Sequence, residues 1–135
     1  LTPFTVNTLT AVTISPPTLN WSSLGLSDID SGSSNDPLLV NNTGNDINLS
    51  MMFTAYNLKG EVTASEFIPA ANFTADASSQ GCSGTAMANA TSTNITATHL
   101  NNGNNTVQAG DVTSGQEEIY FCLKGLPQDI SAKFY

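Results

Sequence analysis

Residues 4–15 read F-T-V-N-T-L-T-A-V-T-I-S, and apolar and polar side chains alternate through most of this stretch. The large apolar side chains at even-numbered positions are Phe4, Val6, Val12 and Ile14, while Leu9 and Ala11 at odd-numbered positions interrupt the pattern. A period of two is typical of a β-strand. At about 3.3 Å per residue, a strand this long spans about 35 Å, roughly twice the usual length. Two prolines, Pro16 and Pro17, end it.

The same alternation recurs along the chain. It is clearest in residues 46–58 and returns in shorter form at residues 19–21, 73–75, 95–97, 119–123 and 130–134. Clusters of Gly, Asn, Pro and Asp separate these segments, and residues 26–37 are predicted to be a loop. A sustained helical stripe is absent from the sequence. We therefore predict an all-β fold, an antiparallel β-sandwich of about eight or nine strands.

The chain is predicted to form one domain, residues 16–135, preceded by a long N-terminal strand in residues 1–15. The two prolines after this strand could set it apart from the rest. The chain begins at Leu1, and we interpret it as a mature product from which a secretion signal has been removed.

The composition excludes several classes of function. Charged residues make up 10% of the chain, against about 25% in an ordinary domain. Three lysines, no arginine and a net charge of −8 cannot form a basic surface for nucleic acid or anionic lipid. Apolar runs fall well short of the roughly 20 residues of a membrane span. Asn, Thr and Ser account for 47 of the 135 residues, which favours an extracellular or cell-surface protein.

The two cysteines, Cys82 and Cys122, are too far apart in sequence for a C-x-x-C redox or zinc pair. An even number of cysteines in a chain of extracellular character favours a disulfide, which would attach a loop to the sheet. Two buried free thiols are the alternative.

Asn-X-Ser/Thr triplets without proline occur seven times, about twice the number expected by chance. In several of them an apolar residue follows the asparagine, so an inward apolar side chain would leave the asparagine in solvent for a glycan. Alternating Asn- and Thr-rich strands also generate such triplets as a by-product. The candidate N-glycosylation sites are Asn20, Asn41, Asn48, Asn72, Asn89, Asn94 and Asn104.

One acidic loop is a weak candidate for calcium. Asp28, Asp30 and Asp36 lie in a stretch with Gly32, and alternating oxygen ligands in such a loop can surround Ca²⁺. Glycine occupies a position where an EF-hand needs a ligand, and no glutamate closes the loop. A solvated loop is the favoured interpretation, so we expect neither a metal nor a cofactor.

The sequence gives little support for catalysis, and we expect a protein that is not an enzyme. His99 is the only histidine, and no nucleophile elbow is present. Carboxylates that a glycosidase could pair are Glu61, Glu66, Glu117 and Glu118, although adjacent residues of a strand face opposite sides. A Lys–Asn crosslink through Lys59, Lys124 or Lys133 cannot be assigned from sequence.

Four aromatic residues could form a carbohydrate-binding face: Trp21, Tyr56, Tyr120 and Tyr135. Aromatic residues are only 7% of the chain, and most are expected in the core. A monomeric cell-surface or surface-layer module that binds carbohydrate is the alternative function.

The N-terminal strand has two possible fates. It can pair within its own sandwich, or it can complete the sheet of a neighbouring copy by strand addition. A head-to-tail contact of the second kind propagates into an open filament.

Three stretches resemble the small secreted β-sandwich subunits of archaeal surface filaments (threads and bundling pili). They are Thr5 to Pro16, Val40 to Asn45 running into residues 47–51, and Ile119 to Pro127 running into Ile130 to Tyr135. The low charge and the many sequons are similar as well. The resemblance implies an immunoglobulin-like sandwich, an N-terminal donor strand and heavy N-glycosylation. A pilin of the type IV kind would instead begin with a long apolar helix, which the N-terminal prolines and threonines exclude.

We therefore predict a structural subunit of an extracellular filament or pilus. It would polymerise with copies of itself by head-to-tail strand donation and carry N-glycans. The predicted donor-strand anchors are Phe4, Val6, Val12 and Ile14.

Overall fold

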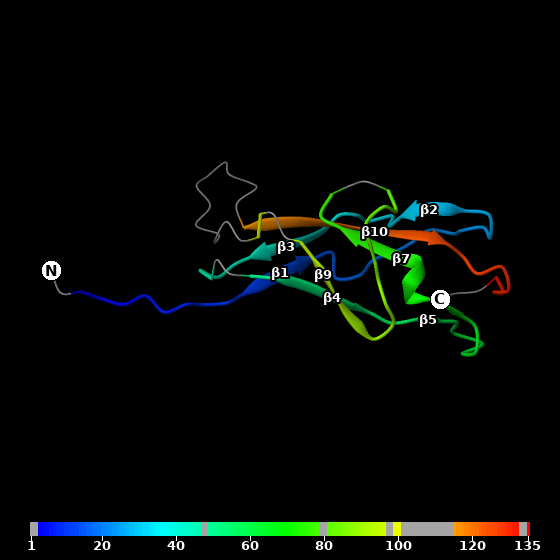
Figure 1. Ribbon diagram of the computed structural model, residues 1–135, viewed down its shortest axis with the longest axis horizontal. Helices are drawn as coiled ribbons and strands as arrows, with labels where there is room; N and C mark the ends of the chain where they lie inside the picture. The colour runs from blue at the N-terminus through cyan, green and yellow to red at the C-terminus, as the bar shows by residue number, and fades with distance from the viewer. Residues whose placement is uncertain (1–2, 47–48, 79–80, 97–98, 101–114, 133–134) are drawn as a thin grey trace.

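The computed structural model describes residues 3–46, 49–78, 81–96, 99–100, 115–132 and 135, and its regular structure there is almost entirely β (Figure 1). One 3-10 turn, Ala70–Asn72, is the only helix in these ranges, so none of the described helical structure is long and apolar enough to cross a membrane. The strands are β1 (Val12–Ser15), β2 (Ile29–Gly32), β3 (Leu38–Asn42), β4 (Met51–Ala55), β5 (Leu58–Lys59), β6 (Phe67–Ile68), β7 (Phe73–Asp76), β8 (Thr85–Ala86), β9 (Thr91–Ile95) and β10 (Gln116–Gly125). The all-β prediction is confirmed.

The long strand β10 organises a six-stranded antiparallel sheet. On one edge it pairs with β7, and on the other its first half pairs with β3 and its second half with β2. Cys122 shows the double pairing directly, since it lies opposite Gly32 on one side and Thr74 on the other. The sheet order is β1-β3-β10-β7-β8, with β2 beside the second half of β10, so β1, β8 and β2 each have an open edge in the described part of the chain.

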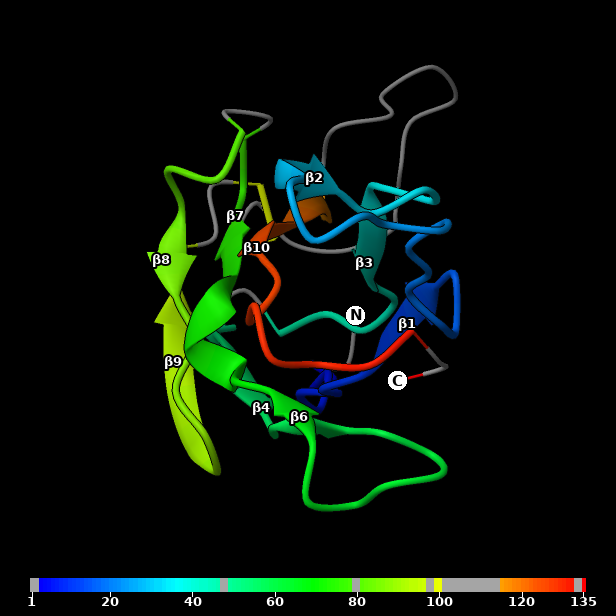
Figure 2. The same ribbon diagram turned by 90° about the vertical axis from the view of Figure 1, so that its right-hand side faces the viewer.

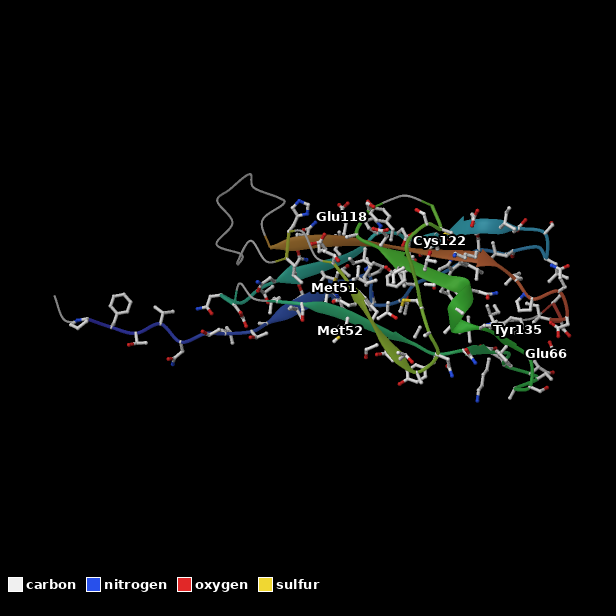
Figure 3. The ribbon with its side chains drawn as sticks, in the orientation of Figure 1. Met51, Met52, Glu66, Glu118, Cys122 and Tyr135 are labelled. Atoms are coloured by element: carbon white, nitrogen blue, oxygen red, sulfur yellow. A yellow bond between two sulfur atoms is a disulfide. The ribbon has the colours of Figure 1, made fainter. Side chains whose placement is uncertain are left out.

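A second, smaller layer consists of β4 paired with β9, and a short β5–β6 hairpin continues it. The apolar core lies between this layer and the large sheet, and Phe53 of β4 meets Phe121 of β10 edge to face, with ring centroids 5.4 Å apart. Neighbours on β4 lie on opposite sides of the strand: Met51 is buried and Met52 is exposed (Figure 3). The buried core cluster is Leu38, Val40, Met51, Ala75, Met87, Ile95, Leu100, Ile119 and Phe121.

The outer face of β10 is covered by the disulfide. Ile119, Phe121 and Leu123 face the core, which places Cys122 on the opposite side of the sheet. The Cys82–Cys122 bond, with 5.2 Å between the α-carbons, holds the residue 81–84 loop against this side and buries Cys122. The predicted disulfide is therefore present, and both cysteines are accounted for.

Several segments differ from the sequence-based expectation. β2 lies inside residues 26–37, which the turn-rich composition predicted to be a loop. Pairing with β10 decides this local structure, because the long central strand offers a hydrogen-bonding edge that sequence composition does not report. The predicted strand in residues 46–58 is broken into β4 and β5, while Ile47 lies outside the described residues.

The N-terminal strand is also shorter than the alternation predicts. Regular pairing covers only β1, which lies antiparallel to β3 with Val12 opposite Asn42 and Ser15 opposite Leu39. Beyond Asn42 the chain enters a turn, and the backbone N–H groups of Thr43, Gly44 and Asn45 donate to the carbonyls of Ala11 and Leu9 without continuing the regular ladder.

Removal of the disulfide should lower stability without changing the fold. The bond closes a loop with a sequence separation of 40, so the double variant Cys82→Ala/Cys122→Ala is expected to lose about 4 kcal/mol of unfolding free energy. Urea unfolding measures this loss, and the reduced parent protein should lose a similar amount. A loss below about 1 kcal/mol in both samples would contradict a stabilising role for the bond.

Candidate functional site

A short turn, Asn42–Asp46, holds the chain that leads into β1; we call it the holding turn. The backbone N–H of Asn45 donates to the carbonyl of Leu9 (2.9 Å), and the N–H of Leu9 donates to the Asn45 side-chain oxygen (2.6 Å). The Asn45 side-chain amide donates to the carbonyl of Asn7 (3.0 Å). A β-carbon at Gly44 would collide with the carbonyl of Leu9, so glycine is what allows this close approach. The chain is therefore tied to its own domain from Asn7 onward.

The residues before Asn7 form an extended arm that points away from the sandwich (Figure 1). We call residues 3–6 the N-terminal arm. Its two large apolar side chains are in solvent, since Phe4 is 87% and Val6 is 69% exposed. A single apolar side chain in water is a normal feature, whereas Phe4 and Val6 lie two residues apart on one extended segment and leave an apolar row in solvent.

The inner face of β1 is the second unusual surface. Residues directly opposite each other in an antiparallel pair point to the same face of the sheet. Ile14 lies opposite Val40 and Val12 lies opposite Asn42, and both of these β3 residues are buried. Ile14 and Val12 thus face the side on which the core lies, yet they are 58% and 52% exposed. The side chains that cover the inner face of the large sheet therefore bury β3 but do not reach β1.

The small layer explains why the cover stops there. Within the described part of the chain, β4 pairs with β9 alone, so its second edge has no strand beside it. Figure 2, which looks along the sandwich, shows β4 lying between β9 and β1. The large sheet therefore extends to β1, while the regular pairing of the small layer ends at β4.

Ten of the twelve exposed large hydrophobic side chains of the described chain fall in two stretches, and the other two are Leu26 and Ile29. The first set belongs to the arm and the strand after it: Phe4, Val6, Leu9, Val12 and Ile14. The second set belongs to β4 and the hairpin that follows: Met52, Tyr56, Leu58, Val62 and Phe67. Val12 and Ile14 of the first set lie on the uncovered inner face of β1.

The N-terminal region and the β4–β9 pair are uncharged, whereas the β5–β6 hairpin carries Lys59, Glu61 and Glu66. No charged residue occurs among residues 1–27, and β4 and β9 contain none either, although the net charge of the chain is −8. Two copies of the chain can approach through these surfaces without bringing like charges together. Of the three cations, Lys59 and Lys124 are exposed and Lys133 lies outside the described residues.

The four predicted donor-strand anchors divide into two pairs. Phe4 and Val6 belong to the arm and extend from the domain, whereas Val12 and Ile14 belong to β1 and form part of the domain's own inner face. All four are exposed, but the structure does not bring them together as one continuous strand.

The acidic loop does not assemble into a metal site. Asp28 accepts a hydrogen bond from the backbone of Gly25 (2.7 Å), and Asp36 accepts one from the backbone of Phe121 (3.2 Å). Asp30 lies on β2 with a positive φ of 51°. Burial raises the pKa of the Asp36 carboxyl, against the effect of its backbone hydrogen bonds. Among the described residues, no group of three acidic, histidine or cysteine side chains could hold a metal ion.

The histidine and one glutamate lie together, and the glutamate is buried. Glu117 is 1% exposed on the inner face of β10, and its carboxylate accepts hydrogen bonds from the backbone N–H of His99 (2.7 Å) and of Leu100 (3.2 Å). The His99 Nδ1 atom lies 3.8 Å from the same carboxylate. This arrangement fixes the residue 99–100 segment over the sheet.

The remaining acidic candidates are separate from this pair. Glu61 is exposed, and Glu118, on the opposite face of β10, accepts a hydrogen bond from the hydroxyl of Tyr120 (2.8 Å), which raises the pKa of that tyrosine. Glu66 binds the C-terminal segment: it accepts hydrogen bonds from the Ser131 backbone (2.9 Å) and from the Tyr135 hydroxyl (3.0 Å) (Figure 3).

A closing strand was predicted over residues 130–135, and the described part of that segment is not strand. The described residues of this segment pair with no strand. The contacts with Glu66 position the segment instead.

The sequons fall into three groups. Asn20, Asn89 and Asn94 are exposed. Asn41 and Asn72 are half-buried, and the Asn72 side-chain amide donates to the carbonyl of Gly125 (2.9 Å). The other two sequons, Asn48 and Asn104, lie outside the described residues.

The aromatic residues do not share one face. Trp21 is half-buried, packs edge to face on Phe73 with ring centroids 5.3 Å apart, and donates its indole N–H to the carbonyl of Ser31 (3.0 Å). Tyr56 is exposed, while Tyr120 and Tyr135 bind glutamates in different parts of the structure.

Sequence reasoning missed the uncovered inner face and the holding turn. The alternation in residues 4–14 indicated an apolar row, but it could not show that part of this row stays outside the core. One signal was available: Asn42 to Asp46 reads N-T-G-N-D, a composition typical of a turn, and Gly44 permits a close backbone approach.

Comparison with known proteins gives no relative. No protein-family model, curated protein or solved structure matches the chain.

The buried Glu117 is expected to be a structural residue. Glu117→Ala leaves the backbone N–H groups of His99 and Leu100 without their acceptor, so it should lower the unfolding free energy by about 2–4 kcal/mol. Its exposed neighbour provides the matched control, and Glu118→Ala should change stability by less than about 0.5 kcal/mol. Urea unfolding of both variants measures the difference, and equal losses would contradict the assignment.

Proposed function

We propose that this protein is a structural subunit of an extracellular, cell-surface filament, and that the N-terminal arm of one copy adds as a β-strand to the next copy. The observation that carries the proposal is the arm itself. It is extended and uncharged, it points away from its own sandwich, and its side chains Phe4 and Val6 are largely in solvent.

The exposed arm supplies a driving force for association. Full burial of one large apolar side chain contributes about 1.5–3 kcal/mol. Burial of Phe4 and Val6 would therefore contribute about 3–6 kcal/mol before the entropy of association is subtracted. Main-chain hydrogen bonds along an added strand contribute further, as in other complexes formed by strand addition.

The symmetry of such a contact favours a filament over a closed pair. The arm and the surface that receives it are different parts of the chain, so the contact is head-to-tail. Each copy then has one arm that can bind a neighbour and one surface that can receive an arm, so further copies can add at both ends. Unless the rotation between copies closes a ring, the product is an open filament.

An extracellular location is supported by three features. The Cys82–Cys122 disulfide is compatible with secretion into an oxidising environment. The charged fraction of 10% is low, and three of the seven sequons lie on exposed residues. Glycans at such positions would cover polar surface outside the proposed contact.

The function is tested by removing the arm alone. Deletion of residues 1–6 leaves β1 and its holding turn in place, so the domain should fold as the parent does. We expect the parent to form filaments in electron micrographs and the truncated chain to remain monomeric in sedimentation velocity.

A second variant checks that the apolar side chains are responsible. Phe4→Ser/Val6→Ser keeps the length of the arm and should also abolish filaments, whereas Thr5→Ser should not. Undiminished fibres from the truncated chain would exclude strand donation by the arm. A parent that stays monomeric at all concentrations would favour the alternative, a cell-surface binding module.

Glycan occupancy should follow exposure. Mass spectrometry of glycopeptides from native material is expected to find glycans on the exposed residues Asn20, Asn89 and Asn94. Asn72 should be unmodified, because its amide lies half-buried against the carbonyl of Gly125. An unmodified chain, or a glycan at Asn72 with none at the exposed sites, would contradict the glycoprotein assignment.

A further inference from the structure

We infer that the arm of a second copy binds in the small layer, beside the free edge of β4, where it covers the inner face of β1. This inference rests on the proposed function and names the surface that receives the arm. We call this position the acceptor slot; it is bounded by β4 and by the side chains of Val12 and Ile14.

The first argument is the exposure of residues that face the core side. Across one row of the large sheet, Val40 is 6% exposed and its partner Ile14 is 58% exposed. An apolar residue on an inner sheet face is normally covered by the opposing layer. Among the described residues the large sheet extends to β1 but the small layer does not, so none of the described strands lies opposite β1.

The second argument is the edge of β4. Its backbone N–H and C=O groups on the side away from β9 have no strand partner among the described residues. A strand added there would lie about 4.8 Å from β4 and about 10 Å below the large sheet. β4 is five residues long, and the arm, residues 3–6, is extended chain that can pair with most of its length.

Other strand edges fit less well. β8, at the far edge of the large sheet, is only two residues long. The outer edge of β1 is available, but a strand added there would extend the large sheet and leave Val12 and Ile14 uncovered. A strand added to β2 would likewise extend the large sheet, and the open edge of β9 lies on the side away from β4. Among the described strands, the edge of β4 is therefore the one in the small layer that lies toward β1 (Figure 2).

The side chains of the arm match the slot in spacing. Phe4 and Val6 are two residues apart, so they point to the same face of an added strand. Turned toward the large sheet, they would lie on Val12 and Ile14, which share the same spacing on β1. Thr5 would then face solvent. Phe4 and Val6 of the inserted arm would then contact Val12 and Ile14 of the receiving copy, so all four exposed apolar residues would be covered.

The charges favour a second copy as the occupant. The arm, β1 and β4 contain no charged residue, although each chain carries a net charge of −8. Two such chains repel each other over most of their surface and meet without repulsion here. The arm of the same copy is a poor occupant, because the holding turn fixes it from Asn7 and directs it away from the sandwich.

The test mixes two variants with complementary defects. Phe4→Lys should disable the arm and leave the slot intact, whereas Ile14→Lys should disable the slot and leave the arm intact. Each variant alone is expected to be monomeric in sedimentation velocity. Their 1:1 mixture should form a species of twice the monomer mass that does not extend, because one slot and one arm remain unusable.

Matched controls lie on the same segments. Thr13→Lys adds the same charge to the outer face of β1, and Thr5→Lys adds it to the solvent face of the arm; both should assemble like the parent. Circular dichroism checks that the variants fold, and Val12→Lys is a second slot variant should Ile14→Lys unfold.

Amide hydrogen exchange locates the contact independently. The peptide that contains β4 should exchange at least tenfold more slowly in the assembled parent than in the Phe4→Lys monomer. The peptide that contains β8 should exchange at the same rate in both.

The outcomes separate this inference from the proposed function. If Phe4→Lys is monomeric while Ile14→Lys and Val12→Lys still assemble, the arm is a donor and the slot is wrong. If the mixture stays monomeric, or if protection appears at β8 instead of β4, the slot is wrong as well. If the parent never assembles, the proposed function fails and the slot fails with it.

Discussion

The double pairing of β10 is the constraint on which the rest of the structure depends. Because this strand has a neighbour on each edge, β3 and β7 are fixed on opposite sides of it, and its alternation directs Ile119, Phe121 and Leu123 into the core. The same alternation places Cys122 on the outer face, where the bond to Cys82 attaches a loop. It also places Glu117 inside, where the carboxylate binds the backbone of residues 99–100.

The unequal size of the two layers has a functional consequence. A six-stranded sheet faces a layer in which β4 pairs with β9 alone among the described residues, so the inner face at β1 lacks cover. The same chain carries an arm with apolar residues in solvent. An apolar face without cover and an apolar segment without contact are each unfavourable in water. Association of two copies, as proposed above, would remove both from water at once, which is the physical basis of the proposed filament.

Particular residues show how far sequence reasoning reached. The alternation around Met51 and Phe53 and around Ile119 and Phe121 predicted core-facing strands, and these residues lie in or against the core. The cysteine count favoured the disulfide that is present. The strand at Ile29–Gly32 was missed, because its residues are Ser- and Asp-rich and only pairing with β10 makes them a strand. The strand predicted over residues 130–135 is absent from the described part of that segment. The backbone N–H of Ser131 donates to the Glu66 carboxylate instead of to a neighbouring strand.

The sequence by itself determined the all-β class, the neutral character of the N-terminal region and the presence of an apolar row at one parity. These properties depend on local periodicity and composition, which are read along the chain. The tertiary structure alone decided which part of that row belongs to the arm and which to β1. That division depends on where β3 ends and where Asn45 captures the backbone of Leu9, and hydrogen bonds between residues 36 positions apart leave no periodic trace in the sequence.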